Sequence, residues 1–344
     1  MKVAVIGSMG VGKSTLFDLL AHGHEGKARG YVSGVGLVEI EDPRIEKIRE
    51  IASPKSVKKP SIEIYDFDGF GKLWKEERVG EILNELLGFD LLIQIVGDFP
   101  PFEPESDFDE IDLRLILADL SIVENKLKRI EKEKMAHRAT EEEAAFFRKF
   151  RDHLSAEKVL SQLHLTEFEK NLIQGYSFLT VMPRVVIFNS SEERVEEDLP
   201  DSLIARLKER GYPHFRTILP IEREIRELEP EERDEILAGY GLESGFVMKL
   251  KRAILDALGL ITFFTTAHDE LTAWLVREGT TAKEAAGHIH TDMERGFIRA
   301  DVVHYDDLLK CGDFKKAKET GHLRSEGKDY VVRDGDIIFI KFSR

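Results

Sequence analysis

Short apolar runs alternate with amphipathic stretches in the N-terminal part of the chain and again from about residue 177. Runs rich in β-branched residues predict strands, and apolar residues three or four positions apart predict helices. The strands predicted in this way are 2–6, 37–40, 61–66, 90–96, 178–180, 183–188 and 214–219. The predicted helices are 16–20, 45–51, 79–87, 222–228 and 246–258, and the stretch 21–34 is predicted to be a loop. Strands that alternate with helices predict an α/β fold with a doubly wound sheet.

This alternation stops between 111 and 176, where the pattern is helical throughout. Apolar residues from Leu120 to Ile130 recur every three or four positions, and capping-box sequences at Thr140 and Thr166 mark new helix starts. The simplest arrangement is a hairpin arm of two antiparallel helices that projects from the sheet domain. The apolar stripe can be a packing seam between the helices or a face that binds a partner.

A third pattern begins near Gly259. Two β-rich runs, 261–266 and 271–276, predict a hairpin, and a short capped helix is expected after it at 281–289. Further strands are predicted at 300–303, 330–332 and 336–342, and this order of elements describes a small β-grasp domain. The predicted domains are a sheet domain made of 1–110 and 177–258, a helical arm at 111–176, and a β-grasp domain at 259–344.

Composition narrows the classes of protein that the chain can belong to. Its 344 residues are 42% hydrophobic and 33% charged, which suits a soluble protein of two or three domains. No apolar run is long enough to span a membrane, no signal-peptide layout is present, and the single Cys311 excludes an internal disulfide framework. We therefore expect a cytoplasmic protein that does not bind membranes. The net charge of −15 argues against nonspecific coating of nucleic acid, so no direct DNA binding is expected, although a local patch could still contact RNA.

The residues with the clearest ligand-binding pattern lie between the first predicted strand and the first predicted helix. Residues 7–15 read Gly-Ser-Met-Gly-Val-Gly-Lys-Ser-Thr, which fits the G-x-x-x-x-G-K-[ST] pattern in its required context of strand, turn and helix. Backbone N–H groups in such a turn point inward around a phosphate, and the helix start adds its positive dipole end. The residues expected to bind nucleotide here are Met9, Gly10, Val11, Gly12, Lys13, Ser14 and Thr15. Lys13 is the predicted catalytic residue, because its amine would reach the β- and γ-phosphates. A glycine-rich turn can also serve packing alone.

A magnesium site is predicted beside this turn. The Ser14 hydroxyl would hold Mg²⁺, and Asp66 at the end of the 61–66 strand could bind the ion through water. Asp66 begins the sequence Asp-Phe-Asp-Gly, which matches the D-x-x-G pattern of P-loop NTPases, and Gly69 would let its backbone approach the γ-phosphate. The expected cofactors are therefore Mg²⁺ and ATP or GTP.

Base recognition is predicted after the 183–188 strand, where Asn189, Ser190 and Glu192 stand at the position of the base-reading motif of P-loop GTPases. In GTPases an Asp there accepts hydrogen bonds from guanine N1–H and from the N2 amine. Here the acid is Glu192, one methylene longer and displaced, and no lysine follows the asparagine, so guanine selectivity should be weak. The same residues can also be an ordinary helix N-terminus.

Several sequences together resemble the YchF, or Obg-like ATPase, family of P-loop NTPases. They are the P-loop, Asp42-Pro43-Arg44, Leu117-Ala118-Asp119-Leu120, Asn189 with Glu192, the stretch from Ile289 to Ala300, the stretch from Glu326 to Tyr330, and Asp334-Gly335-Asp336. The resemblance implies a G domain interrupted by a helical arm and followed by a TGS domain of β-grasp fold. It also implies a preference for ATP over GTP and association with ribosomes or translation factors.

The chain departs from that family in its switch regions. No clear counterpart of the switch I threonine is found, and Gly30 falls roughly there; 71–78 replaces a glycine-rich switch II; and Leu219-Pro220 replaces small residues beside the base. The residue after D-x-x-G is Phe70, hydrophobic as in the family, and Phe70 cannot hydrogen-bond an attacking water. The chain can thus be a divergent paralogue, and slow hydrolysis is expected.

Three functions remain open on these grounds. The first is a slow, Mg²⁺-dependent, adenine-preferring NTPase that acts as a switch on the translation apparatus. The second is a nucleotide-bound interaction scaffold with little or no turnover. The third is a small-molecule kinase, which is disfavoured because nothing after the P-loop resembles an acceptor-binding lid.

Overall fold

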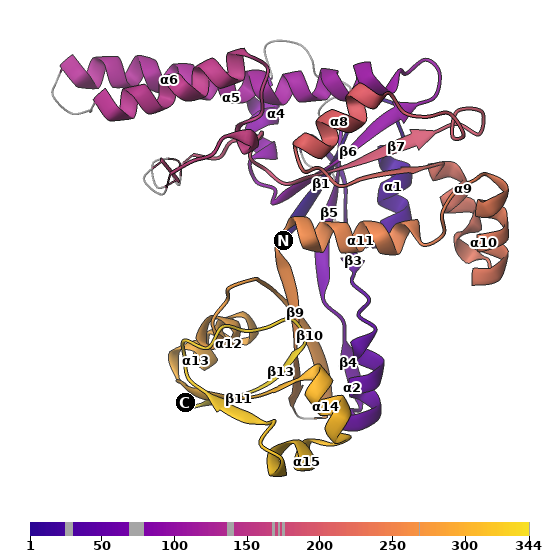
Figure 1. The fold of residues 1–344 in the computed structure, drawn as a ribbon, viewed down its shortest axis with the longest axis vertical. Coiled ribbons are helices and arrows are strands. Elements are labelled where there is room, and N and C mark those ends of the chain that lie inside the picture. Colours follow the sequence, from indigo (N-terminus) through magenta and orange to yellow (C-terminus); the bar gives the residue numbers. More distant parts are fainter. Residues whose placement is uncertain are drawn as a thin grey trace. The chain divides into compact units, whose positions relative to one another are not determined.

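The computed structural model describes residues 1–24, 30–68, 79–135, 141–166, 169–170, 173, 176–267 and 269–343. The chain forms two compact units, and neither is continuous in sequence. The first unit comprises Met1–Leu37 and Glu63–Ile254, and the second comprises Val38–Ile62 and Leu255–Arg344. Figure 1 traces both along the sequence.

The first unit is built on a seven-stranded sheet in the order β2-β3-β5-β1-β6-β7-β8. The strands are β1 (Lys2–Ile6), β2 (His22–His24), β3 (Val32–Glu39), β5 (Ser61–Phe67), β6 (Leu91–Asp98), β7 (Arg184–Ser190) and β8 (His214–Thr217). Neighbours from β5 through β8 pair in parallel, and every residue of β6 and β7 is buried, as expected for strands covered on both faces. The carboxyl ends of β1, β5, β6 and β7 therefore meet at one edge, which positions the candidate site.

The helices of this unit, apart from the arm, follow the strands as the alternation predicts. They are α1 (Lys13–Leu20), α4 (Val79–Leu86), α8 (Asp201–Glu209), α9 (Leu219–Glu224), α10 (Pro230–Gly239) and α11 (Phe246–Ala257), with 3₁₀ turns at Leu160–Gln162 and Ile225–Glu227. The predicted α/β fold class is confirmed. The helix predicted at 222–228 begins earlier, at Leu219, with a proline in its first turn.

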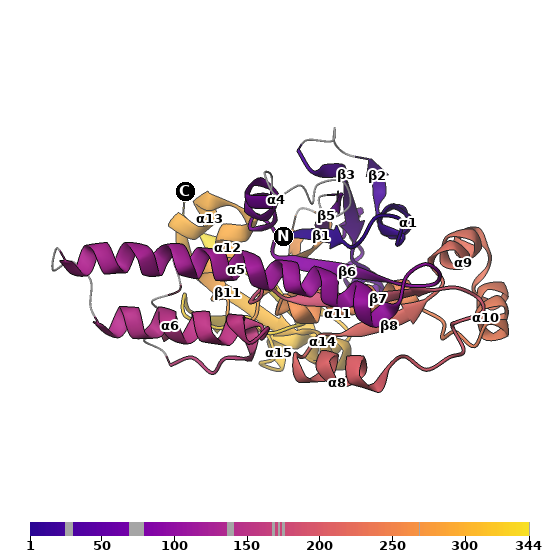
Figure 2. The ribbon, with the colours of Figure 1, turned by 90° about the horizontal axis from the view of Figure 1, so that it is seen from above.

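Two long helices form the predicted hairpin. Helix α5 (Pro104–Met135) and helix α6 (Glu141–Ser155) lie side by side in Figures 1 and 2. Their seam is aromatic and aliphatic; its buried residues include Val123, Ile130, Phe147, Phe150 and Leu154. The apolar stripe is thus a packing seam in this structure. The capping box predicted at Thr166 is confirmed by its reciprocal hydrogen bonds with Glu169, of 2.8 and 3.2 Å.

Helix α5 starts well before the predicted boundary at 111. Pro104 occupies its first position, and Glu105 and Asp107 lie in its first turn. Its first part packs on the sheet, where Ile111 and Leu115 join the same core as β1 and β6, and only its later part belongs to the arm. One continuous helix therefore connects the sheet with the arm.

The second unit is a six-stranded sheet in the order β12-β11-β13-β9-β10-β4. Its strands are β4 (Ser56–Lys58), β9 (Leu260–Ala267), β10 (Glu270–Arg277), β11 (Phe297–His304), β12 (Arg324–Glu326) and β13 (Asp336–Phe342). Its helices are α2 (Arg44–Ala52), α12 (Ala282–Ile289), α13 (Thr291–Arg295), α14 (Tyr305–Cys311) and α15 (Phe314–Glu319). The predicted β9–β10 hairpin and the capped helix α12 are both confirmed.

The division of the chain differs from the predicted one at 38–62. This segment leaves the sheet of the first unit and adds α2 and β4 to the second unit, where β4 pairs in parallel with β10. Ile45 and Ile48 of α2 are buried in the same cluster as Phe264 and Leu271. Burial of these apolar residues explains why the segment belongs with the C-terminal part of the chain.

Three local predictions are wrong. The stretch 178–180 contains no strand: Leu179 and Thr180 lie in a turn, where the N–H and the hydroxyl of Thr180 donate to the buried Asp119. The stretch 330–332 makes only an isolated bridge, between Val331 and Thr281. The predicted loop at 21–34 contains β2 and the beginning of β3.

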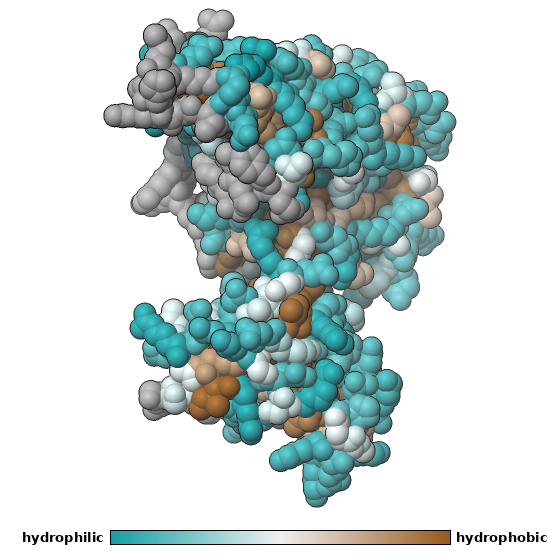
Figure 3. Space-filling model, turned by 60° about the vertical axis from the view of Figure 1, so that its left-hand side comes forward, coloured by the Kyte–Doolittle hydropathy of each residue, from teal (hydrophilic) through white to brown (hydrophobic). Residues whose placement is uncertain are grey.

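The surface drawn in Figure 3 is mostly hydrophilic, with small apolar areas. Within the described residues, no helix is long and apolar enough to cross a lipid bilayer.

Candidate functional site

The turn between β1 and α1 has a positive φ at three glycines, Gly7, Gly10 and Gly12, and a side chain at Gly7 or Gly12 would also collide with a neighbouring segment. Gly12 has a φ of 106°, and a Cβ there would lie 2.8 Å from Nδ2 of Asn189. A Cβ on Gly7 would lie 2.5 Å from the carbonyl oxygen of Ile95 on β6. The turn is thus pressed against the ends of its neighbouring strands, and any side chain at these positions would push it outward.

Lys13, the first residue of α1, folds its side chain back over this turn. Its Nζ donates to the carbonyl oxygens of Gly7 and Ser8 at 3.1 and 2.8 Å, and it lies 3.8 Å from Oδ1 of Asp68. Burial lowers the pKa of Lys13, and the nearby carboxylates of Asp68 and Asp66 oppose that shift. The turn thus holds a positive charge at its centre, where an anionic group would be attracted.

Ser14 and Asp66 meet beside the lysine. The Ser14 hydroxyl donates to Oδ2 of Asp66 at 2.7 Å, which joins the start of α1 to the end of β5. The other carboxylate oxygen of Asp66 is buried and has no hydrogen-bond partner among the described residues. Burial raises the pKa of Asp66, while the hydrogen bond from Ser14 lowers it. A hydroxyl and an unsatisfied carboxylate oxygen are the hard oxygen donors that Mg²⁺ prefers, so these residues fit that ion.

The remaining residues of the predicted phosphate loop lie around this centre. Val11 is fully buried, whereas Met9 is 65% exposed at the tip of the turn. Gly10 has a φ of 88° and open space around its Cα, and Thr15 is half-buried in the first turn of α1. Gly69, Phe70 and 71–78 lie outside the described residues.

Asn189 at the end of β7 is tied to two neighbouring segments. Its Nδ2 donates to the carbonyl oxygen of Val11 at 2.9 Å, and its Oδ1 accepts from the backbone N–H of Leu219 at 2.9 Å. Leu219 is fully buried and begins α9, which packs on α1. The structure therefore brings together the predicted phosphate loop and two segments expected near the base.

Ser190 and Glu192 are placed differently from Asn189. The Ser190 hydroxyl is buried and bonded to Asp98, and Arg216 binds both of them, with Nε 2.9 Å from Ser190 Oγ and 3.0 Å from Asp98 Oδ2. Successive side chains of a strand point to opposite faces, which separates Ser190 from Asn189. Glu192 is exposed in the following turn. In this conformation the Ser190 side chain therefore links β7 to Asp98 of β6 and Arg216 of β8, and it does not point toward the predicted base site.

The sequence interpretation assigned no role to Asp68, and it also missed a carboxylate of α5 in this region. Asp107 in the first turn of α5 is 6% exposed; its Oδ1 accepts from the Ser8 hydroxyl and its Oδ2 from the N–H of Gly97 at 2.8 Å. Burial raises the pKa of Asp107, against the hydrogen bonds from Ser8 and Gly97. In the sequence, an acid in the first turn of a helix is common, so the pattern gave no signal of this contact.

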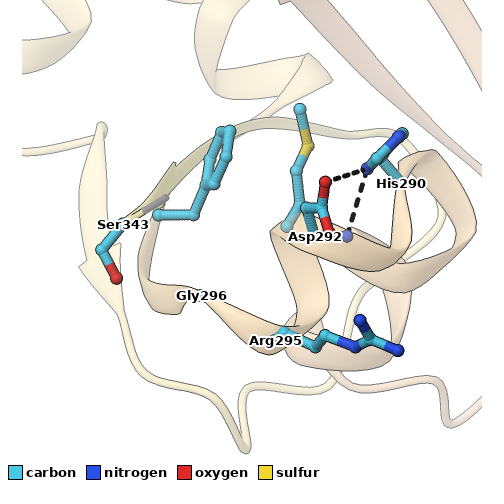
Figure 4. A pocket seen from close by; sticks show the side chains of 7 residues that line it. His290, Asp292, Arg295, Gly296 and Ser343 are labelled. Atoms are coloured by element: carbon cyan, nitrogen blue, oxygen red, sulfur yellow. Dashed lines mark hydrogen bonds and ion pairs between the residues drawn. The ribbon is translucent and has the colours of Figure 1, made fainter.

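The second unit contains a cavity of about 700 Å³, shown in Figure 4. It is lined by His290, Asp292, Met293, Arg295, Gly296, Phe342 and Ser343. Nδ1 of His290 accepts from the backbone N–H of Asp292 at 3.1 Å. His290, Asp292 and Arg295 are all exposed, so we assign no ligand to this cavity.

Comparison with known proteins places the whole chain among homologues. It is 33% identical to the "Ribosome-binding ATPase YchF" of Bacillus subtilis (strain 168), over 100% of this chain and 99% of that protein. It is 32% identical to the protein of the same name from Escherichia coli O157:H7, over 99% of both. A family model named YchF-GTPase_C, described as a protein of unknown function (DUF933), matches residues 260–343.

Solved structures show the same fold. The Schizosaccharomyces pombe YchF GTPase superposes with a TM-score of 0.83 at 23% identity, covering 99% of this chain and 97% of that one. A GTP binding protein from Pyrococcus horikoshii OT3 superposes with a TM-score of 0.64 at 18% identity, covering 100% of both. The resemblance inferred from the motifs is confirmed, and the chain belongs to the YchF family.

Proposed function

We propose that this protein binds a magnesium nucleoside triphosphate at residues 7–15, hydrolyses it slowly with ATP preferred over GTP, and acts as a switch on the ribosome or on translation factors. The observation that carries the proposal is the placement of Lys13 at the centre of the glycine turn, beside the Ser14–Asp66 pair. A buried positive charge next to hard oxygen donors suits a polyphosphate with its metal ion.

We propose a separate role for each of these residues. Backbone N–H groups of residues 9–15 and the Lys13 ammonium would bind the phosphates, with Gly69 close to the γ-phosphate. Ser14 and Asp66 would hold Mg²⁺, which when bound neutralises charge on the phosphate oxygens. Phe70 has no group that could orient an attacking water, so we expect slow turnover unless a partner supplies such a group.

The bonds that Asn189 makes support the proposed weak guanine selectivity. One amide hydrogen is used by Val11 and the carbonyl oxygen by Leu219, which leaves a second N–H for a base. The N7 atom of a purine is an acceptor in both adenine and guanine, so a donor directed at N7 does not discriminate between them. With Glu192 exposed in the following turn, we propose that Asn189 and Glu192 contact the base, and Ser190 through its backbone.

The proposed partner comes from the relatives, which are named ribosome-binding ATPases. Cosedimentation of the purified protein with ribosomes, with and without a nonhydrolysable ATP analogue, tests this part. Association that depends on the analogue supports the proposed switch. Absence of the protein from the ribosome pellet in both conditions would remove it.

Nucleotide chemistry is tested by titrating Mg·ATP and Mg·GTP calorimetrically and by measuring phosphate release. We expect Lys13→Ala to abolish turnover and to weaken binding about a hundredfold, by analogy with removal of a buried charged partner. The matched control is Lys47→Ala, because Lys47 is an exposed lysine on α2 that pairs only with Glu50 among the contacts described. Turnover that survives Lys13→Ala would overturn the assignment.

The alternative of a nucleotide-bound scaffold is favoured by one observation, Phe70 at the position after D-x-x-G. It predicts stoichiometric bound nucleotide and no phosphate release, even with ribosomes present. Multiple turnover by the wild-type protein would exclude it.

A further inference from the structure

Asp107 connects the glycine turn to the long helix of the arm. Its two oxygens are both used, one by the Ser8 hydroxyl in the turn and the other by the N–H of Gly97 near the end of β6. Ser8 also gives its carbonyl oxygen to the Lys13 ammonium at 2.8 Å. One carboxylate therefore fixes the side chain of the residue whose backbone holds the lysine.

The surroundings of Asp107 suit a positioning role and not a chemical one. The carboxylate is buried, and the charged groups near it are Lys13 of the turn and Glu110 and Arg114 of its own helix. A general base needs a free oxygen aimed at the reacting water. Both oxygens of Asp107 instead accept hydrogen bonds from the protein.

The rest of α5 is fastened to β7 and to neighbouring turns of the first unit by further buried carboxylates. Asp112 accepts from Arg184 and Arg210 at 3.0 and 2.6 Å, and Asp119 accepts from the N–H groups of Leu179 and Thr180 at 2.9 and 2.8 Å. Beyond Asp119 the same helix runs on to Met135 in the arm. At 1.5 Å per residue, the helix reaches about 40 Å from Asp107 to its end. Rigid secondary-structure elements of this kind are among the structures that carry coupling between distant sites.

We propose that Asp107 is a positioning residue of the phosphate site, which sets the conformation of Ser8 and Lys13 and couples that site to α5 and hence to the arm. The inference rests on the proposed nucleotide binding and deepens it. A ligand that rearranges the turn changes the Ser8–Asp107 contact and thereby shifts α5. A partner bound to the arm acts on nucleotide affinity through the same contact, since coupling between two sites is reciprocal.

Two substitutions at this position separate hydrogen bonding from charge and from bulk. Asparagine can still accept from Gly97 through Oδ1 and donate to the Ser8 oxygen through Nδ2, so Asp107→Asn keeps both contacts. Leucine has a similar volume and can make neither, so Asp107→Leu frees Ser8 and leaves the Gly97 N–H unsatisfied. We expect Asp107→Leu to raise the Kd for Mg·ATP about tenfold or more and Asp107→Asn to change it by less than about threefold. The control is Asp109→Asn, which removes the same charge two residues further on, where Asp109 pairs with Arg206 of α8.

The coupling is measured by hydrogen exchange of the full chain with and without saturating Mg·ATP, after thermal unfolding has shown that each variant is folded. We expect nucleotide to slow exchange in peptides covering 91–98 and 104–119 of the wild type and of Asp107→Asn, and to leave 104–119 unchanged in Asp107→Leu. If Asp107→Leu does not fold, Ser8→Ala replaces it. We then expect the same absence of nucleotide-induced protection from exchange at 104–119. Equal affinities and equal protection in all variants that bind Mg·ATP would overturn the inference alone, whereas a wild type that binds no nucleotide overturns the proposed function with it.

Discussion

Arg44 and Asp334 are separated by 290 residues and are joined by two parallel hydrogen bonds, Nη1 to Oδ2 at 2.8 Å and Nη2 to Oδ1 at 3.1 Å. The same guanidinium binds Asp42 and lies over the ring of Phe264, 5.4 Å from its centroid. Both residues belong to motifs that supported the family resemblance. Their role in this structure is to hold the 38–62 segment within the second unit.

Replacing Arg44 by alanine should destabilise the second unit by about 2 kcal/mol, because charge-assisted hydrogen bonds to Asp42 and Asp334 are lost. The substitution Arg44→Lys should not restore the stability, since lysine cannot make the bidentate contact with Asp334. Urea denaturation followed by the fluorescence of Trp274 on β10, in a Trp74→Phe background that removes the other tryptophan, reports on this unit. Arg49→Ala is the control, because Arg49 is an exposed residue of the same helix; an equal effect of both substitutions would contradict the assigned role.

Alanine at Gly12 should abolish detectable nucleotide binding, because this position has a positive φ and its Cβ would collide with the amide of Asn189. Gly239→Ala is the matched control. Gly239 ends α10 with open space around it, and alanine there should be neutral or stabilise by up to about 1 kcal/mol. Isothermal titration with Mg·ATP and thermal unfolding compare the two. Normal affinity in Gly12→Ala would show that the turn can move without loss.

Removal of the metal tests the Ser14–Asp66 pair. Excess EDTA should weaken ATP binding to the wild type about tenfold or more, because the phosphate charge is no longer neutralised. Ser14→Ala and Asp66→Asn should already be weak in magnesium and should respond little to EDTA. Ser202→Ala, an exposed serine of α8, should behave as wild type. A full EDTA effect in both site variants would place the metal elsewhere.

Asp119 should make stability depend on pH in an unusual direction. Burial raises the pKa of Asp119 to about 6, despite hydrogen bonds from Leu179 and Thr180 that favour the charged form. A carboxyl group whose pKa is higher in the folded state than its usual 3.8 binds more protons when folded, so its stabilising contribution is lost as the pH rises through about 6. The difference between these two pKa values corresponds to about 3 kcal/mol.

This dependence is isolated by the variant Asp119→Asn, which cannot titrate and presents an amide to the N–H groups of the 179–180 turn. We expect the variant to be less stable than the wild type at pH 4.5 and the gap to narrow by about 2 kcal/mol toward pH 7, because part of the full difference is already lost below pH 4.5. Denaturant unfolding at a series of pH values measures the gap. Asp152→Asn, an exposed site on α6, should show a constant difference; a gap that widens with pH for Asp119→Asn would reverse the assignment.

The features predicted correctly are those with local causes. The strand, glycine turn and helix at the N-terminus follow from a fixed spacing of glycines, lysine and serine, and the antiparallel arm follows from helical periodicity around Val123 and Phe147. The structure adds the left-handed backbone at Gly12 and the packing of the two arm helices. The glycine turn and the arm themselves were predictable because the residues that define each of them lie close together in the sequence.

The features that were missed depend on residues far apart. Strand β4 is only Ser-Val-Lys, too short to show alternation, and it exists because β10 offers an edge. The apolar run at 178–180 resembles a strand, yet Leu179 is buried in a turn held by Asp119. Asp107 gave no signal because its partner Ser8 lies 99 residues away. Tertiary contacts decided these positions, and pattern alone contains no information on them.

The crossing of 38–62 into the second unit has a consequence for the order in which the protein is made. Lys55, just before β4, pairs with Asp269, which follows it by 214 residues. At a synthesis rate of 5–20 residues per second, the growing chain waits about 10 to 40 s before those neighbours emerge. During that interval the apolar face of α2 cannot pack against its native partners. The nascent protein therefore passes through a stage with exposed apolar surface, in which it is prone to chaperone binding and to misfolding.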